Sequence, residues 1–456
     1  MELAKENKMG VMPVNKLLIS MSLPMIVSML IQALYNIVDS IFVAQISEGA
    51  LTAVSMAFPM QNLMIAVAAG TGTGINALLS RSLGEKNQKV VDKTANNGVF
   101  LSVCSYAVFA VIGMLFSRSF FAAQLNDAQI IEYGNDYLFV ICICSFGLFG
   151  QFLFERLLQA TGRTIYSMYT QGAGAIINLI LDPILIFGMF GVPAMGVRGA
   201  AIATVAGQII AMLLGLAFNI RINHEVNLHF QQMIHPDGHI IKKVYEIGVP
   251  SIIMQSIASV LTFGMNRILG TFSATAVAVF GVYFKLNSFI FMPVFGMNNG
   301  LIPILSYNYG AEKYDRIKKT IKLGMIYAIS IMLIGLVIFQ IIPGPLLRMF
   351  DASDDMMGIG VTALRIISTS FVFAGFCIIC STVFQAIGNP LHSLIISVVR
   401  QLVILLPVAY LLSKTGKLDL IWLSYPIAEI ASLIISAIFL KKTIHKLNYH
   451  QRNEEL

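Results

Sequence analysis

The chain has 456 residues, of which 57% are hydrophobic and 12% are charged. An ordinary soluble domain is roughly 45–50% apolar and about 25% charged, so this composition excludes a water-soluble fold. The formal net charge of +7 does not indicate a nucleic-acid partner, because the basic residues recur in alternate polar connections along the chain instead of forming one patch.

Long apolar stretches separated by short polar connections predict about twelve transmembrane helices, since one crossing needs roughly 20 apolar residues. The expected spans are residues 17–43, 52–80, 96–117, 136–159, 165–189, 197–220, 244–270, 276–306, 320–342, 360–386, 392–413 and 419–442. The first stretch is too long for the core of a signal peptide, so we expect it to remain as a helix. The predicted fold class is an all-α polytopic membrane protein.

Basic residues are concentrated on one side of the predicted membrane. They are Lys5, Lys8, Lys16, Arg81, Lys86, Lys89, Lys93, Arg221, Lys242, Lys243, Lys313, Arg316, Lys318, Lys319, Lys322, Lys441, Lys442 and Lys446. The other side holds Arg118, Arg198, Arg348, Lys414 and Lys417. Because cytoplasmic connections are rich in Lys and Arg, we expect both termini in the cytoplasm and the chain in the inner (cytoplasmic) membrane.

Six spans precede and six follow a polar break, which predicts an N-terminal lobe at residues 1–222, a cytoplasmic linker at 223–243 and a C-terminal lobe at 244–456. The linker's histidines match no metal-ligand spacing. A shift of 226 residues aligns Pro24 with Pro250, Gly70 with Gly296, Gly74 with Gly300, Ser80 with Ser306, Gly84 with Gly310, Thr94 with Thr320, and Gln159-Ala160-x-Gly162 with Gln385-Ala386-x-Gly388. An even number of spans per half gives a parallel repeat, which predicts two pseudo-symmetric six-helix bundles around a central cleft and movement by alternating access.

All five cysteines lie in apolar stretches, where a free thiol packs as a small hydrophobe. Cys377 and Cys380 have CxxC spacing, but no second pair or nearby histidine completes a metal site. We therefore expect packing roles and no disulfide.

A polar stripe runs along the first span, where Gln32, Tyr35 and Asp39 are spaced to share one helix face. The equivalent positions in the second half are Ala258, Leu261 and Met265, so the polar face is confined to the first half. A charged side chain at the bilayer centre costs about 2.5–3.5 kcal/mol on insertion scales, so it needs a partner, a cavity or a task.

In the fifth span, Asn178 and Asp182 are i, i+4 neighbours, and Pro183 follows, which frees a backbone carbonyl. Asp39 and Asp182 are expected at the same depth, near the outer ends of their spans, and Thr204 of the sixth span reaches that depth. Together these oxygen-bearing groups could form a small Na⁺ or proton site. Two desolvated acids close together could also exchange protons near neutral pH. The alternative is that both acids only bond to neighbouring helices.

Three charged residues of the second half, Lys285, Arg400 and Glu429, are expected near mid-membrane. They could pair with one another, or they could serve substrate binding or coupling. Glu155 and Arg156 lie near the cytoplasmic end of the fourth span and favour a local salt bridge over a transport site.

Several stretches resemble the multidrug and toxic compound extrusion (MATE) family, in the superfamily that also holds oligosaccharidyl-lipid and polysaccharide exporters. The resemblance covers nearly the whole chain. It rests on SLPMIVSMLIQALYNIVDSIFVAQI, RSLGEKN, LQATGRTIYSM, INLILDPILIFG, GVRGAAIAT and KLNSFIFMPVFGMNNGLIPILSYNYGAEKYDRIKKT, among which LDPILIFG and FMPVFGMNNG are the most specific.

The resemblance implies a prokaryotic two-lobed carrier that exports cationic or amphipathic drugs in exchange for H⁺ or Na⁺. The N-lobe site of similar proteins matches Gln32, Tyr35, Asp39, Asn178 and Asp182. Thr204 is a weaker match, because the loop that precedes it varies among similar proteins. Some relatives have a second acidic site, with Glu in the seventh span and Asp in the tenth. Neither acid is present here, which favours Asp39 and Asp182 as the coupling residues.

The hypothesis is therefore a monomeric, multi-pass antiporter with a small organic cation as substrate, lipid as surroundings and no cofactor. The sequence contains no GxxxxGK[ST] motif, which would have indicated ATP use. The alternative within the superfamily is a lipid-linked oligosaccharide flippase, which would use basic residues such as Arg400 and Lys285. A membrane-embedded enzyme would need clustered histidines or acids at one interface, and none is evident. A structural or receptor role would leave the intramembrane acids unexplained.

Overall fold

The computed structural model describes residues 6–124, 127–350 and 352–454, and Lys5 lies outside them. Within these residues every regular secondary-structure element is a helix. The helices are α1 (Lys8–Val11), α2 (Val14–Ala44), α3 (Glu48–Gly84), α4 (Gln88–Ala122), α5 (Ala128–Ile143), α6 (Phe146–Ala160), α7 (Thr164–Phe187), α8 (Gly196–Arg221), α9 (Phe230–Ile234), α10 (Gly238–Gly270), α11 (Ala274–Gly310), α12 (Tyr314–Ile341), α13 (Pro343–Arg348), α14 (Asp354–Ser368), α15 (Phe371–Ala386), α16 (Pro390–Val398), the π-helix η1 (Val399–Leu405), α17 (Leu406–Ser413), α18 (Leu418–Ile421) and α19 (Ser424–Glu454).

The predicted all-α polytopic fold is confirmed. Among the described residues, ten helices are long and apolar enough to cross a membrane, and twelve crossings result if two bent pairs each form one span. The bent pairs are α5 with α6, at 45°, and α14 with α15, at 48°. The predicted spans at 136–159 and 360–386 are therefore each formed by two helices with a bend between them. Each of these spans begins earlier than predicted and is interrupted near its middle, at Cys144 and at Thr369.

Most other helices are longer than their predicted spans, because polar turns continue them beyond the apolar stretch. For example, α3 extends the predicted 52–80 at both ends, and the hydroxyl of Ser47 caps its start by accepting from the Ala50 N–H at 3.0 Å. The cysteines of the described chain are free thiols, as predicted, and Cys377 and Cys380 are buried.

Packing divides the chain into two units. Unit 2 is Val27–Ile252, and unit 1 combines Met1–Ile26 with Ile253–Leu456. Both boundaries fall inside a helix, α2 or α10, two residues after Pro24 or Pro250. The lobes and linker expected from the sequence, residues 1–222, 223–243 and 244–456, remain a prediction.

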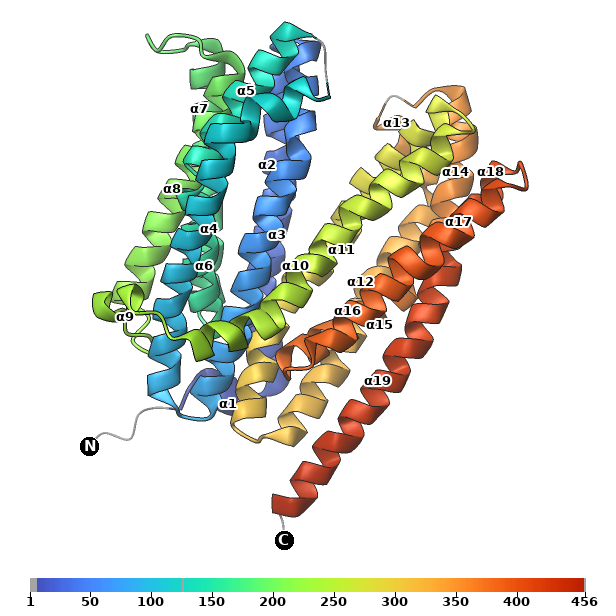
Figure 1. The fold of residues 1–456 in the computed structure, drawn as a ribbon. Helices are drawn as coiled ribbons and strands as arrows, with labels where there is room; N and C mark the ends of the chain where they lie inside the picture. Colours follow the sequence, from blue (N-terminus) through green and yellow to red (C-terminus); the bar gives the residue numbers. More distant parts are fainter. Residues whose placement is uncertain (1–5, 125–126, 351, 455–456) are drawn as a thin grey trace. The chain divides into compact units, whose positions relative to one another are not determined.

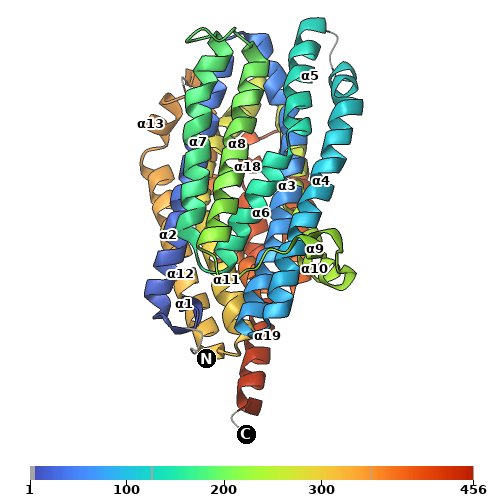
Figure 2. The same cartoon turned by 90° about the vertical axis from the view of Figure 1, so that its left-hand side faces the viewer.

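In unit 2, α7 and α8 lie side by side, and α4 packs against α3, α5 and α6 (Figures 1 and 2). The core of this unit is aliphatic and aromatic, with Phe121, Phe149 and Leu157 among its buried side chains.

Residues 222–237, which include α9, are held against the start of α4. The side-chain oxygens of Asn96 and Asn97 accept from the backbone N–H groups of His229 and Asp237, each at 2.8 Å. Lys93 forms an ion pair with Asp237 at 2.6 Å. This connection is docked by specific bonds, and no group of His, Cys, Asp or Glu in the described chain could hold a metal ion.

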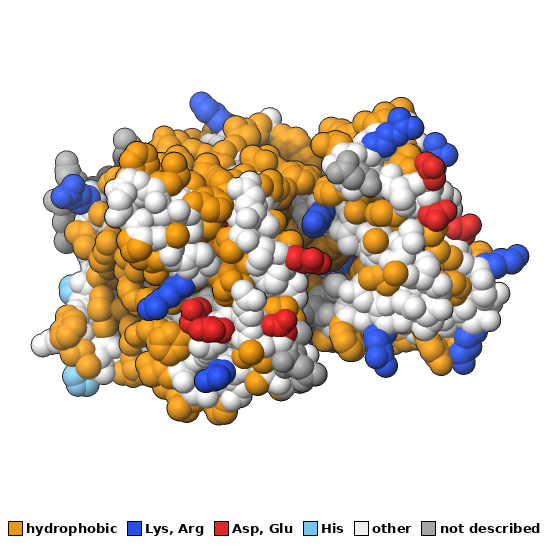
Figure 3. Space-filling view, turned by 90° about the horizontal axis from the view of Figure 1, so that it is seen from above, with side chains coloured by type: hydrophobic (Ala, Val, Ile, Leu, Met, Phe, Trp, Pro, Cys, Tyr) orange, Lys and Arg blue, Asp and Glu red, His pale blue; other side chains and the backbone are white. Residues whose placement is uncertain are grey.

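Figure 3 looks onto the ends where α4 and α7 finish and α8 begins. Its Lys, Arg, Asp and Glu side chains are scattered among apolar and uncharged atoms, with no large patch of one sign.

Candidate functional site

Three helices of unit 2 position the predicted N-lobe residues: α2 carries Gln32, Tyr35 and Asp39, α7 carries Asn178 and Asp182, and α8 carries Thr204. The first of these helices presents its polar stripe on one face, as the spacing predicted. All six residues are thus brought to one region of the unit, in agreement with the sequence prediction of their proximity.

Two glycines allow α7 and α8 to approach closely. A Cβ atom at Gly174 would lie 2.9 Å from the carbonyl oxygen of Gly207, and one at Gly207 would lie 2.5 Å from the carbonyl oxygen of Gly174. Real Cβ atoms do not come so near, so larger residues would push the helices apart. The close approach places Asn178 beside Thr204.

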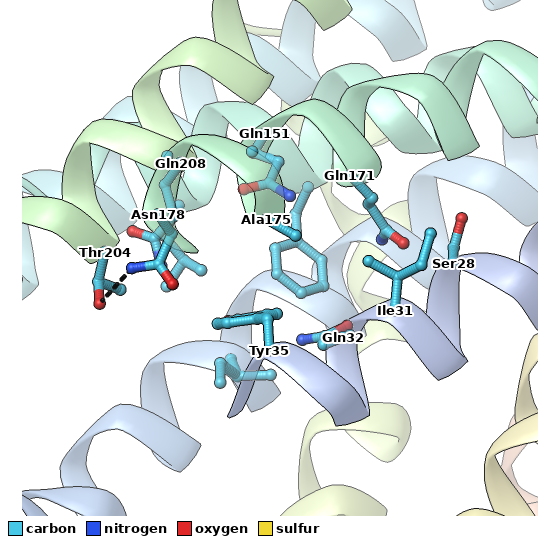
Figure 4. Close-up of a pocket in the computed structure, with 15 residues that line it drawn as sticks. Ser28, Ile31, Gln32, Tyr35, Gln151, Gln171, Ala175, Asn178, Thr204 and Gln208 are labelled. Atoms are coloured by element: carbon cyan, nitrogen blue, oxygen red, sulfur yellow. Dashed lines mark hydrogen bonds between the residues drawn. The ribbon is translucent and has the colours of Figure 1, made fainter. Parts of the chain in front are cut away.

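Asn178 links the acidic pair to α8. Its amide nitrogen donates to Asp182 Oδ1 and to Thr204 Oγ1, both at 3.4 Å, the second bond being drawn in Figure 4. The carboxyl groups of Asp39 and Asp182 lie within hydrogen-bonding reach of one another, and Tyr35 lies within electrostatic range of both. Asp182 is fully buried.

Several oxygens of this group are buried without a hydrogen-bond partner in the protein. They are Asp39 Oδ1, Asp182 Oδ2 and Asn178 Oδ1. Buried oxygens in native proteins are nearly always paired, so this cluster indicates a place for a proton, a cation, water or a ligand donor. Carboxylate, amide and hydroxyl oxygens are also the ligands that hard cations such as Na⁺ prefer.

A cavity of about 60 Å³ adjoins the acidic pair. Among its lining residues are the predicted Gln32, Tyr35, Asn178 and Thr204, together with Ser28, Gln151, Gln171 and Gln208. Asp39 and Asp182 are not among them and lie beyond Asn178. In Figure 4, Gln32 and Tyr35 of α2 face Gln151 of α6 and Gln171 of α7.

Three glutamines of the cavity, Gln151, Gln171 and Gln208, were missed in the sequence analysis, which considered mainly charged residues. Three uncharged glutamines inside apolar spans were the signal available for them. Tyr137 was missed as well. It lies within electrostatic range of Asp39, and its hydroxyl accepts from Gln61 at 3.1 Å.

The structure separates the second-half candidates. Arg400, in the π-helix η1, pairs with Glu429 of α19 at 3.2 Å. Lys285 does not join them: it is exposed and lies 6.0 Å from the ring centroid of Phe350. Mutual pairing of all three residues is therefore wrong, and pairing of Arg400 with Glu429 is confirmed.

The fold and the site together define a polytopic helical membrane protein built from a repeat, with acids placed inside one half. The sequence profile of the MatE family matches residues 24–184 and again 250–411, two stretches that begin 226 residues apart. The chain therefore belongs to the MatE family, the MATE transporters of the wider superfamily named above. This confirms the predicted family and the prediction that the chain is not an enzyme.

Two relatives and one solved structure are similar to this chain over nearly its whole length. The chain is 25% identical over 416 residues to the multidrug export protein MepA of Staphylococcus haemolyticus, covering 91% of this chain and 90% of that protein. It is 25% identical over 418 residues to the FAD transporter of Shewanella oneidensis, covering 92% of each. A multidrug resistance MATE family transporter in an outward-facing conformation matches 98% of this chain and 100% of its own, with a TM-score of 0.92 and 24% identity.

Proposed function

We propose that this protein is a secondary active antiporter that exports cationic or amphipathic organic compounds in exchange for H⁺ or Na⁺. The observation that carries the proposal is the Asp39–Asp182 pair, with buried unpartnered oxygens, beside a cavity lined by polar side chains. Relatives named as multidrug exporters support the substrate class.

The proposed cycle follows from the charge of the acidic pair. With both carboxylates ionised, unit 2 attracts an organic cation from the cytoplasmic side. Protons or Na⁺ entering from outside neutralise the pair, and this favours release of the cation. The organic cation and the coupling ion thus compete, directly or through helix bending, for states of the acidic pair, and the inward ion gradient resets the carrier.

The size of the cavity limits what it can hold. A drug-sized ligand needs a pocket of roughly 300–1,000 Å³ by usual pocket measures. The space of about 60 Å³ suits a few water molecules or the charged head of a ligand. We therefore assign the head of the substrate to this cavity, and alternating access requires the site to enlarge.

The structure weighs against the flippase alternative. A lipid-linked pyrophosphate needs several unpaired basic side chains, but Arg400 is already paired with Glu429, so only Lys285 remains of the two expected candidates. A relative named as a FAD transporter raises a narrow anionic substrate as another possibility. Two carboxylates beside the cavity disfavour such a substrate here.

The test is efflux of a fluorescent cation from proteoliposomes under a proton gradient or, separately, a Na⁺ gradient. One gradient should drive efflux by the wild type, and Asp39→Asn or Asp182→Asn should reduce coupled efflux at least about tenfold, because neither variant can exchange the charge. Asp355→Asn, which removes an exposed acid at the start of α14, is the matched control and should keep wild-type efflux.

Full coupled export by Asp39→Asn would refute the role of the acidic pair. Failure of both gradients to move the cation through the wild type would instead refute antiport of organic cations and favour the flippase or a narrow-substrate carrier.

A further inference from the structure

Glu155 is a buried acid whose contacts lead to the cavity. Its side chain lies in α6 and is 2% exposed. Gln151 donates its amide nitrogen to Glu155 Oε1 at 3.0 Å, and Gln171 donates to Oε2 at 2.8 Å. The hydroxyl of Thr170 adds a bond to Oε1 at 3.2 Å. Glu155 does not line the cavity, but both glutamines do.

These bonds determine which way the two amides face. An ionised carboxylate only accepts hydrogen bonds, so each glutamine must turn its NH₂ group towards Glu155. The carbonyl oxygen of each amide then points away from Glu155. Arg156 lies within electrostatic range of Glu155, and its guanidinium donates to Gln159 Oε1 at 2.7 Å.

Asn178 is oriented in the same way at the other end of the cavity. Its NH₂ group donates to Asp182, so its carbonyl oxygen also faces away from a carboxylate. The oxygens Gln171 Oε1 and Asn178 Oδ1 are both buried and have no hydrogen-bond partner in the protein. In Figure 4 the oxygen of Gln171 points towards Ile31 and Ser28. Two residues of the cavity lining therefore have an unsatisfied acceptor, and the amide of each is held by a carboxylate.

We propose that Glu155 is a positioning residue that sets substrate specificity: through Gln151 and Gln171 it presents amide oxygens to the cavity, which selects cations that donate N–H bonds. Amidinium, guanidinium and primary or secondary ammonium groups satisfy both charge and acceptors. Quaternary ammonium and phosphonium ions supply only charge and leave the acceptors unpaired. This inference rests on the proposed function, because it concerns the substrate head of the same site.

The variant Glu155→Gln tests the orientation directly. A glutamine at this position has one carbonyl oxygen and one NH₂ group, so it cannot accept from both neighbouring amides in their present orientation. At least one of them turns over or loses its bond. We compare binding of an amidinium dye, 4′,6-diamidino-2-phenylindole, with binding of tetraphenylphosphonium, which has no N–H, by equilibrium dialysis of the purified protein.

The expected result is that Glu155→Gln weakens amidinium binding about tenfold and changes tetraphenylphosphonium binding less than about twofold, since one discriminating hydrogen-bond set is lost. Gln171→Met, which keeps the side-chain length without polar atoms, should show the same selective loss. Asp355→Asn, which removes an exposed acid at the start of α14, is the control: both affinities should stay near the wild-type values.

Equal weakening of both cations, or no change in either, by both Glu155→Gln and Gln171→Met would overturn the inference. Failure of the proposed function gives a different pattern, in which the wild type fails to export either cation under either gradient. Wild-type export of both cations without selective loss in the variants leaves the antiporter intact and removes only the role of Glu155.

Discussion

Charged side chains inside the helices differ in what satisfies them, and this difference separates transport candidates from structural ones. Asp39 and Asp182 face one another and keep oxygens without protein partners. Glu429 also has one such oxygen, Oε2, but its Oε1 accepts from a cation, Arg400. A like-charged pair is costly unless a proton or cation joins it, whereas an opposite pair is complete in itself.

We therefore expect Arg400 and Glu429 to act as a structural pair. Both side chains are largely buried, with exposed fractions of 22% and 12%. Arg400→Met alone should destabilise the protein by about 3–5 kcal/mol, because it leaves Glu429 buried without a cation. The double variant Arg400→Met/Glu429→Met should recover most of that loss. Thermal unfolding in detergent measures both effects.

Lys285→Met is the control for this experiment, since an exposed lysine should contribute little to stability. A double variant that is as unstable as the single one would show that the unpaired charge of Glu429 is not the cause of the instability. A double variant that keeps its stability but loses export would show that the pair has a role in transport instead.

Residue patterns predicted the stripe on α2 because helical periodicity alone places Gln32, Tyr35 and Asp39 on one face. The convergence with Asn178 and Asp182 followed from depth and from the family resemblance. The contact of Glu155 with Gln171 could not be predicted in this way, because it depends on how α6 packs against α7. For the same reason, the sequence could not show that Lys285 lies apart from Arg400 and Glu429.

At the scale of helices, apolar length predicted where spans lie, because the lipid interior requires it. It did not predict the breaks in two spans. The bend between α5 and α6 falls at Cys144 and Ser145, in a stretch as apolar as its neighbours, so hydropathy gives no sign of it. The docked connection before α10 was also missed, because its polar composition is that of a solvated linker.

The docking of that connection should depend on pH. The hydrogen bond from Lys93, followed by that from the His239 N–H, lowers the pKa of Asp237. A lowered pKa in the folded state stabilises docking above the unfolded value of about 3.9, and the contribution is lost as pH falls through the folded pKa. We expect deuterium uptake by residues 222–237, corrected for intrinsic exchange, to rise in the wild type only below about pH 4.

Asp237→Asn should raise this uptake a few-fold already at pH 7, a modest change because the ion pair is partly exposed. Glu246→Gln, which neutralises an exposed acid in α10, is the matched control and should not change it. Equal uptake by Asp237→Asn and the wild type at pH 7 would show that the connection is held without the ion pair, by bonds such as those of Asn96 and Asn97.

At the scale of the whole molecule, the 226-residue repeat extends to individual bonds. Ser80 donates to the Ala160 carbonyl and Ser306 to the Ala386 carbonyl, both at 2.9 Å. The unit boundaries after Ile26 and Ile252 are also 226 residues apart. The repeat therefore preserves the scaffold in both halves, while the polar face of α2 is confined to one of them. The candidate site therefore belongs to one half of a repeated scaffold.

Both ends of the described chain lie at the same end of unit 1. The carbonyl of Met9, in α1, accepts from Asn308 at 3.0 Å, and Gln451, near the end of α19, accepts from Lys318 at 2.7 Å. Asn308 and Lys318 flank the turn between α11 and α12. This region is rich in basic residues: Lys313, Arg316, Lys318, Lys319 and Lys322. Because such residues are retained on the cytoplasmic side, we propose that both termini are cytoplasmic.

Cysteine labelling on intact cells tests this orientation. Lys319→Cys and Lys417→Cys exchange the same residue type at the two predicted faces, in a background in which Cys104, the exposed native cysteine of the described chain, is replaced by alanine. A membrane-impermeant maleimide should label Lys417→Cys in intact cells and Lys319→Cys only after permeabilisation. The reverse pattern would invert the molecule, and the ion gradient proposed to neutralise Asp39 and Asp182 would then drive import instead of export.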